Sequence, residues 1–328
     1  MAFSPRLFPF LFGTFIAVSY IVISSPVVRA GAPADPVRLT SVANATVRTG
    51  PSADAPAVAQ LPLGTEVQEA GPGGFDKTWV LVRMSDAREG WLQARLTKPL
   101  DPLWRTEAYD AVIADRLSRK GDGFNALAEL VSFIDRAASA YGDAESRANV
   151  DLSRLRALAL ATAAIPFGNA KREPYASWLG ARKSDVTYDE PGGRWMVRNT
   201  SIWDAHAKHQ ETAAADDIAW FAVTSGLAGE CEGNVACYFS AQNMLHGEYL
   251  RAHPFGRHAA DAVAAVTTMV DTVISSGQVK KPYEFNRKED CTQLTFAVDG
   301  LSSALQVAKG PGGESTLANL SAVRQLCQ

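Results

Sequence analysis

The sequence has no excess of positive charge, and this absence excludes one class of function. Its 328 residues contain 32 lysines and arginines against 35 aspartates and glutamates, a formal net charge of −3. Without Arg6 and Arg29 of the first thirty residues, 30 basic residues face 35 acidic ones, a net charge of −5. Nucleic-acid binding needs a basic patch for the phosphate backbone. We therefore predict no nucleic-acid partner.

Catalytic signatures are also absent from the sequence. There is no Gly-x-Ser-x-Gly elbow, no His-Glu-x-x-His pair and no phosphate-binding glycine loop, the patterns that place a nucleophile, zinc ligands and phosphate contacts. The histidines all fall within one segment, but without the ligand spacing typical of zinc; they are His206, His209, His246, His253 and His258. We predict no enzymatic activity, no cofactor and no metal site.

No cysteine lies near the N-terminus, which excludes a lipid anchor there. Instead, Arg6 precedes an apolar run over residues 7–23, and the small residues Val28 and Ala30 suit signal-peptidase cleavage before Gly31. Residues 1–30 are therefore expected to be a signal peptide, and the mature protein to be periplasmic or extracellular. A run of roughly 20 apolar residues could also span a bilayer, so membrane attachment is expected only if the segment stays uncleaved.

The chain has only four cysteines, Cys231, Cys237, Cys291 and Cys327. An oxidising compartment favours disulfides over free thiols, and four cysteines allow three pairings. Cys291 opens one apolar-periodic segment and Cys327 closes another, with a glycine-rich turn between them, which predicts a C-terminal helical hairpin. Its two ends meet, so this geometry favours a Cys291–Cys327 bond and leaves Cys231–Cys237 to close a short loop, although sequence alone does not decide the pairing.

The N-terminal part of the mature chain reads as β structure. Short β-favouring runs alternate with turn residues, at 45–47, 58–61, 65–70, 79–84 and 90–92. Four separated segments then carry a resemblance: Thr46-Val47-Arg48-Thr49-Gly50-Pro51-Ser52, Leu63-Gly64-Thr65, Trp79-Val80-Leu81-Val82 and Gly90-Trp91-Leu92. In this order and spacing they resemble a bacterial SH3 domain. The resemblance implies a small all-β SH3-like barrel over residues 35–98.

Bacterial SH3 domains commonly hold proteins against peptidoglycan or other wall polymers, so the resemblance implies a wall polymer or wall peptide as ligand. Candidate contact residues at turns or strand ends are Arg48, Phe75, Trp79 and Asp86. Alternatively, Trp79 belongs to the core and Arg48 is a solvated surface charge. Trp91 is expected to enter the barrel core, with Gly90 permitting close backbone approach.

Residues 103–328 are predicted to form an all-α body. Helical periodicity is clear from Phe124 to Ala138 and from Leu152 to Ala163. A looser stretch over residues 165–199 carries Pro, Gly and the tryptophans Trp178 and Trp195. A loop of that length is often functional, but we favour the interpretation that these tryptophans cover a helical core.

Two segments of the body are alike. Residues 203–220 and 249–265 each lead from an aromatic-led helix through a polar turn to a helix with Ala-Ala-Asp near its start. This pattern resembles the degenerate helix-pair repeats of tetratricopeptide-like envelope proteins, and the chain as a whole resembles exported bacterial proteins that join an SH3 module to such a body.

The sequence supports two functional hypotheses. In the first, the protein is a non-catalytic scaffold of the cell envelope, whose SH3 module contacts a wall polymer and whose helical body contacts a protein partner. In the second, the body is a wall hydrolase or a hydrolase inhibitor targeted by the module, with Glu230, Glu232 and His253 as its candidate functional groups. We prefer the first, because no catalytic constellation is visible.

Overall fold

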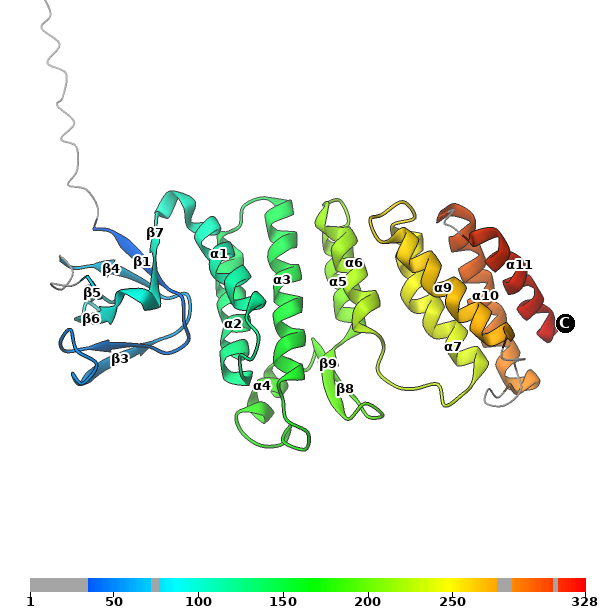
Figure 1. Ribbon diagram of the computed structural model, residues 1–328, viewed down its shortest axis with the longest axis horizontal. Helices are drawn as coiled ribbons and strands as arrows, with labels where there is room; N and C mark the ends of the chain where they lie inside the picture. Colours follow the sequence, from blue (N-terminus) through cyan, green and yellow to red (C-terminus); the bar gives the residue numbers. More distant parts are fainter. Residues whose placement is uncertain (1–34, 72–76, 276–284, 309–311) are drawn as a thin grey trace, which may run out of the picture. The chain divides into compact units, whose positions relative to one another are not determined.

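The computed structural model describes residues 35–71, 77–275, 285–308 and 312–328. An antiparallel sheet comes first and a helical body follows it (Figure 1), so the predicted order of a β part and a helical part is confirmed. The predicted signal peptide over residues 1–30 and the candidate contact Phe75 lie outside the described residues.

The sheet has seven strands in the order β3-β2-β6-β5-β4-β1-β7. In chain order they are β1 (Val37–Thr40), β2 (Ala45–Arg48), β3 (Ala57–Leu61), β4 (Glu66–Glu69), β5 (Trp79–Arg83), β6 (Glu89–Gln93) and β7 (Thr97–Leu100). Five of them fall on the predicted runs. The other two, β1 and β7, pair with each other and carry the sheet past the predicted boundary at residue 98.

One face of the sheet encloses a small apolar core. Val47, Val82 and Leu92 are fully buried there, and Arg48 points outward from the neighbouring position, as predicted. Gly90 does permit close approach, because a Cβ there would lie 2.5 Å from Val47 Cγ1. The prediction for Trp91 is wrong: it is only half-buried, since strand alternation points Gly90 and Leu92 inward and Trp91 to the opposite face.

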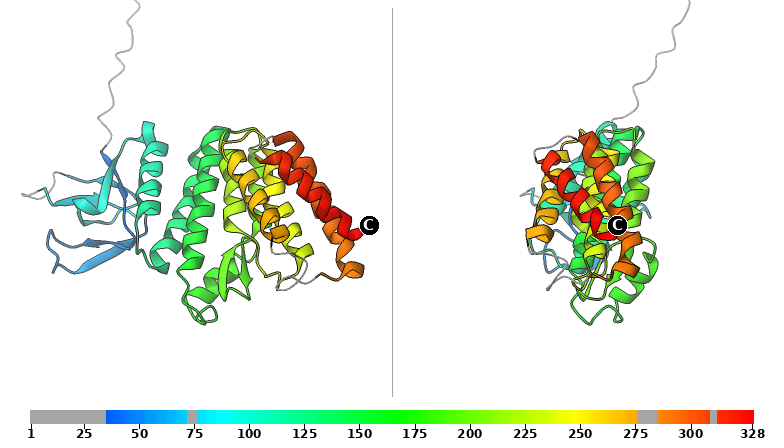
Figure 2. Two further views of the ribbon diagram at one scale, coloured as in Figure 1. Left: turned by 45° about the vertical axis from the view of Figure 1, so that its right-hand side comes forward. Right: turned by 90° about the vertical axis from the view of Figure 1, so that its right-hand side faces the viewer.

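The helical body runs from residue 102 to residue 327. Its helices are α1 (Arg105–Ser118), α2 (Phe124–Ala137), α3 (Ala144–Ala163), α4 (Tyr175–Ala181), α5 (Asn199–His209), α6 (Ala214–Ser225), α7 (Val235–Gln242), α8 (Glu248–Ala252), α9 (Ala259–Ser275), α10 (Arg287–Ala308) and α11 (Gly313–Arg324). Helical neighbours pack as α2 on α3, α5 on α6, α7 on α10, and α10 on α11 (Figure 1 and Figure 2). Single helical turns, η1 to η5, complete the elements: η1 (Ala94–Leu96), η2 (Pro102–Trp104), η3 (Ala138–Ala140), η4 (Asn243–Gly247, a π-helix) and η5 (Gln325–Cys327).

The body is not purely α-helical, which corrects the prediction. The stretch over residues 165–199, expected to be loose, contains α4 and a two-stranded hairpin, β8 (Val186–Asp189) with β9 (Arg194–Val197). The aromatic residues of α4 cover the helical core as expected: Trp178 and Tyr175 contact the ring of Phe124 at centroid distances of 5.4 and 4.6 Å.

The β part and the first helices share one apolar cluster. Leu39, Leu63 and Leu100 of the β part are buried with residues of α1, α2 and α3. The Leu63 backbone is held on both sides, since its N–H donates to the Glu129 carboxylate and its carbonyl accepts from Arg136 Nη2 at 2.8 Å. Gly64 lies against the ring of Phe133. This turn of the β part is therefore built into the main core.

Both disulfides favoured by the sequence geometry are present. Cys231 and Cys237 close the short loop before α7, and Cys291 in α10 bonds Cys327 in η5. The second bond joins the start of α10 to the end of α11, so it closes the open end of the C-terminal helical hairpin. Disulfides are characteristic of oxidising compartments.

Candidate functional site

The structure places three of the four predicted contact residues. Arg48 is half-buried and its Nη1 donates to the Ala55 carbonyl at 2.7 Å. Trp79 is 8% exposed, yet within the described part of the chain it belongs to none of the apolar clusters. Asp86 lies in the turn after β5 and pairs with Arg88, whose hydrogen bonds lower the pKa of the Asp86 carboxyl.

Trp79 is buried on the face of the sheet opposite the core. Val80 and Val82 of the same strand face the core, so Trp79 and Leu81 point the other way. Leu81 is paired with Trp91, and Trp91 in turn with Arg48. Directly opposed residues on antiparallel strands bring their side chains into contact range. Arg48, Leu81 and Trp91 thus form one row, called here the outer row, which crosses β2, β6 and β5.

The sequence reasoning missed Leu81 and Trp91 as surface residues. The available signal was alternation: if Leu92 is inward, Trp91 is outward. The outer row combines an aromatic ring, an aliphatic side chain and a guanidinium, all half-buried. The cores of protein–protein interfaces have a similar composition, because they are enriched in aromatic residues and arginine.

A second cluster forms among the histidines. His206 of α5 and His253, which directly follows α8, meet with their Nε2 atoms 2.8 Å apart. Their ring centroids are 5.0 Å apart at 85° between planes, so the two rings meet tip to tip. One ring nitrogen therefore donates to the other, and their lone pairs do not converge on a shared metal position. Within the described residues, no group of three or more metal-ligating side chains gathers.

The surroundings of this pair are aromatic and acidic. Trp220 stacks on the His258 ring at 4.7 Å between centroids. The Tyr249 hydroxyl donates to Asp216 Oδ1 at 2.5 Å and accepts from the His258 backbone N–H at 3.0 Å. Burial and this bond raise the pKa of Tyr249, while the same bond helps hold the pKa of Asp216 below its ordinary value. These contacts join α6 to the segment after α8, and they serve packing.

Because of these histidines, we expect the stability of the fold to decrease in acid. Burial lowers the pKa of His206, His246 and His253 below the ordinary 6.5, and at His206 the neighbouring His253 adds to that effect. Glu248 opposes it at His206, and Asp216 at His253. The unfolded chain therefore binds more protons below about pH 6.5, so the free energy of unfolding is largest above that pH and falls as the pH drops through the lowered native pKa values.

We expect the urea midpoint to fall between about pH 7.5 and about pH 5.5. In His206→Gln, one of these titrations is removed, so the midpoint should vary less with pH than in the unsubstituted protein. A midpoint that stays constant or rises on acidification would contradict the assignment.

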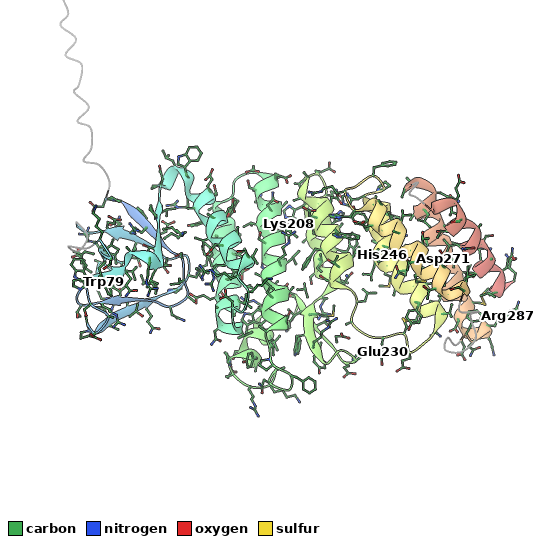
Figure 3. The ribbon with its side chains drawn as sticks, viewed as in Figure 1. Trp79, Lys208, Glu230, His246, Asp271 and Arg287 are labelled. Carbon is green, nitrogen blue, oxygen red and sulfur yellow. A yellow bond between two sulfur atoms is a disulfide. The ribbon has the colours of Figure 1, made fainter. Side chains whose placement is uncertain are left out.

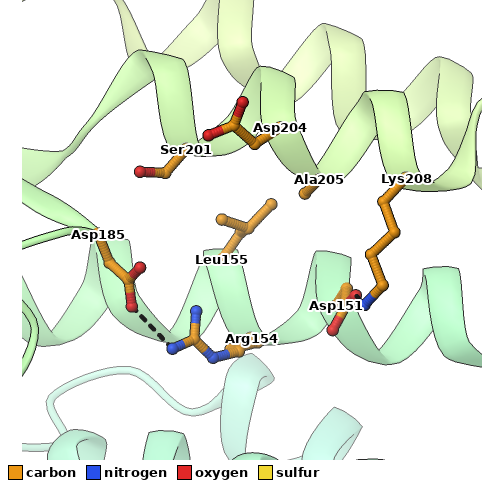
Figure 4. A pocket seen from close by; sticks show the side chains of 8 residues that line it. All are labelled: Asp151, Arg154, Leu155, Asp185, Ser201, Asp204, Ala205 and Lys208. Carbon is orange, nitrogen blue, oxygen red and sulfur yellow. Dashed lines mark hydrogen bonds and ion pairs between the residues drawn. The ribbon is translucent and has the colours of Figure 1, made fainter.

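A hollow of about 290 Å³ lies between α3 and α5 (Figure 4). Four of its charged side chains form two pairs: Arg154 bonds Asp185 at 2.8 Å, and Lys208 bonds Asp151 at 2.7 Å. Asp151 also meets His209 Nε2 at 2.7 Å, and the pKa of its carboxyl is lowered by these two partners against the effect of burial. The Lys208–Asp151 pair joins α5 to α3, and the Arg154–Asp185 pair joins α3 to the turn before β8. Both contacts hold neighbouring elements together, which is a structural role.

The acidic pair considered for the hydrolase hypothesis lies on the surface. Glu230 and Glu232 flank Cys231 in the segment between α6 and α7, and both are exposed; Glu230 is labelled in Figure 3. His253, the third candidate, is occupied by His206. The structure therefore places these carboxylates in a solvated turn and the imidazole in a packed cluster.

Comparisons with family models, curated proteins and solved structures found no match to this chain. In the described part of the chain, none of the helices combines the length and apolar character needed to cross a membrane.

Proposed function

We propose that this protein is an exported, non-catalytic binding protein of the cell envelope. Its β part contacts a wall polymer or wall peptide, and its helical body contacts a protein partner. The observation that carries the proposal is the outer row, Arg48, Leu81 and Trp91, which lies on the sheet face opposite the core.

The outer row supports this proposal through its composition and position. An indole and an aliphatic side chain offer apolar contact area, and a neighbouring guanidinium offers hydrogen bonds to carboxylates. Arg48 already uses one nitrogen on Ala55, which fixes the direction of its side chain. The turn between β3 and β4 is not available for a ligand, because its residues Leu63 and Gly64 pack on α2.

The proposal predicts that Trp91→Ala weakens binding to purified peptidoglycan. Loss of a central aromatic contact typically costs more than about 1 kcal/mol of binding free energy. We therefore expect the dissociation constant for peptidoglycan, measured by sedimentation, to rise about tenfold. Phe296→Ala is the matched control, since Phe296 is 74% exposed on α10 and lies outside the β part.

Equal retention of Trp91→Ala and Phe296→Ala would refute the assignment of the outer row. Absence of retention for the unsubstituted protein would refute wall binding itself. A zymogram of the unsubstituted protein tests the non-catalytic part of the proposal: a cleared zone that is lost in Glu230→Ala or His253→Ala would replace it by the hydrolase hypothesis.

A further inference from the structure

A second, larger hollow lies beside the β8–β9 hairpin. Its volume is about 490 Å³, within the range of small-ligand sites. It is formed by the segment that follows α3 and by both strands of the hairpin; the side chains used below are Phe167, Lys171, Tyr188, Arg194 and Trp195. It belongs to the helical body and shares no residue with the outer row.

Three aromatic rings from three different segments line this hollow. Phe167 is 84% exposed, and Tyr188 is 41% exposed. The ring of Phe167 nevertheless packs against Gly193, where an added Cβ would lie 2.8 Å from the Phe167 Cε2 atom. Tyr188 and Trp195 are cross-strand partners whose ring centroids are 5.5 Å apart. Exposed aromatic rings held in place by neighbouring structure are typical of binding surfaces.

One polar atom of the lining is unused. Trp195 Nε1 is buried and, among the described residues, has no hydrogen-bond partner. A buried N–H without a partner is costly and calls for an explanation. Because the atom is covered by its neighbours, a ligand hydroxyl would reach it only after those neighbours move.

The charge of the lining is entirely positive. Lys171 and Arg194 contribute cations, and none of the lining residues is acidic. Arg194 Nε lies 3.3 Å from the buried Asp189, which also accepts from the Gly229 N–H at 3.0 Å; this contact steadies the guanidinium while leaving it 66% exposed. Residues 165–199 carry six basic and four acidic side chains, although the chain as a whole has a net charge of −3. The local charge therefore favours an anionic ligand.

We propose that this hollow binds an acidic sugar unit of a polysaccharide. The C–H faces of a sugar ring would stack on the rings of Phe167 and Tyr188, and the sugar carboxylate would pair with Lys171 and Arg194. A volume of about 490 Å³ accommodates a compact ligand rather than an extended peptide. The proposal goes beyond the wall contact assigned to the outer row and does not depend on it.

The experiment is calorimetric titration of the purified protein with three probes. These are an oligogalacturonate, a maltooligosaccharide of the same length and an oligoglutamate of the same charge. We expect the oligogalacturonate to bind, and the neutral sugar and the acidic peptide to bind at least about tenfold more weakly, because each lacks one of the two contacts.

Five single variants locate the site. Phe167→Ala and Lys171→Ala should each weaken oligogalacturonate binding about tenfold. Phe296→Ala and Lys120→Ala remove the same side-chain types from exposed positions elsewhere, and they should bind as the unsubstituted protein does. Trp91→Ala should also bind normally, which separates this site from the outer row.

Three outcomes would overturn the proposal. The first is absence of oligogalacturonate binding by the unsubstituted protein. The second is equal binding of the oligoglutamate, which would indicate a site for acidic peptides. The third is undiminished binding by both Phe167→Ala and Lys171→Ala, which would place the sugar elsewhere on the molecule.

Discussion

Gly64→Ala should lower the free energy of unfolding by about 3 kcal/mol or more. Gly64 has φ +73°, a conformation that alanine adopts only with strain. Its new Cβ would lie 2.0 Å from Cδ2 of Phe133, a side chain that is 2% exposed and cannot turn away into solvent. Urea unfolding followed by circular dichroism measures the loss.

Gly50→Ala is the matched control for this substitution. A Cβ at Gly50 would lie 3.7 Å from Ala55 Cβ, an ordinary van der Waals contact, and its φ is not positive. We expect a change of less than about 1 kcal/mol there. Combining Gly64→Ala with Phe133→Leu should recover part of the loss, because the smaller side chain relieves the clash but not the backbone strain. Equal midpoints for the two glycine variants would contradict the packing described.

Gly64 also shows where sequence reasoning about this fold ends. The pattern Leu63-Gly64-Thr65 correctly indicates a turn before a strand, since β4 begins at Glu66. It contains no information on what the turn contacts, because Phe133 is far away in the sequence and lies within a segment predicted only to be helical. Local periodicity identifies elements, whereas the partners of a buried turn depend on tertiary packing.

Trp91 illustrates a different limit. Alternation along a strand determines which residues share a face, but not which of the two faces is buried. The size of the indole favoured the core, while Gly90 and Leu92 in fact occupy it. The hairpin β8–β9 was missed for another reason: its strands are only four residues each, and prolines and glycines lie before and between them.

The candidate sites also differ in how far the sequence predicts them. The histidines lie within one stretch of the sequence, and the contact of His206 with His253 joins the two similar segments. The hollow with Phe167 and Trp195 was less accessible, because it requires the segment after α3 to fold back on the hairpin. The sequence singles out Trp195 in this stretch but not Phe167, and spacing does not predict that the two converge.

The C-terminal disulfide should contribute more stability than the short one. In the chain-entropy model, a cross-link stabilises by restricting the unfolded chain, and its effect grows with the length of the closed loop. Cys291 and Cys327 are 36 residues apart, whereas Cys231 and Cys237 are 6 apart. Removal of the longer link should therefore cost about 4 kcal/mol and removal of the shorter about 2 kcal/mol.

Packing adds to the difference between the two bonds. Cys327 and Leu326 lie against the apolar cluster formed by α7, α9, α10 and α11, so the bond holds the end of α11 on that cluster. Cys231 and Cys237 instead close a loop next to Asn234, whose side-chain oxygen already accepts from the Cys237 N–H at 2.9 Å at the start of α7. This N-cap remains when the short bond is lost, and it keeps the local structure in place.

The test compares two double variants, Cys291→Ala with Cys327→Ala, and Cys231→Ala with Cys237→Ala, by urea unfolding without reductant. The first should show the larger fall in midpoint, and in the unsubstituted protein a reductant should lower the midpoint at least as far as the first double variant does. A larger loss from the short link would mean that the loop before α7 stabilises the fold through contacts that chain entropy does not describe. Similar losses from both would point to native-state contacts of comparable strength, because loop length alone separates the two values by about 2 kcal/mol.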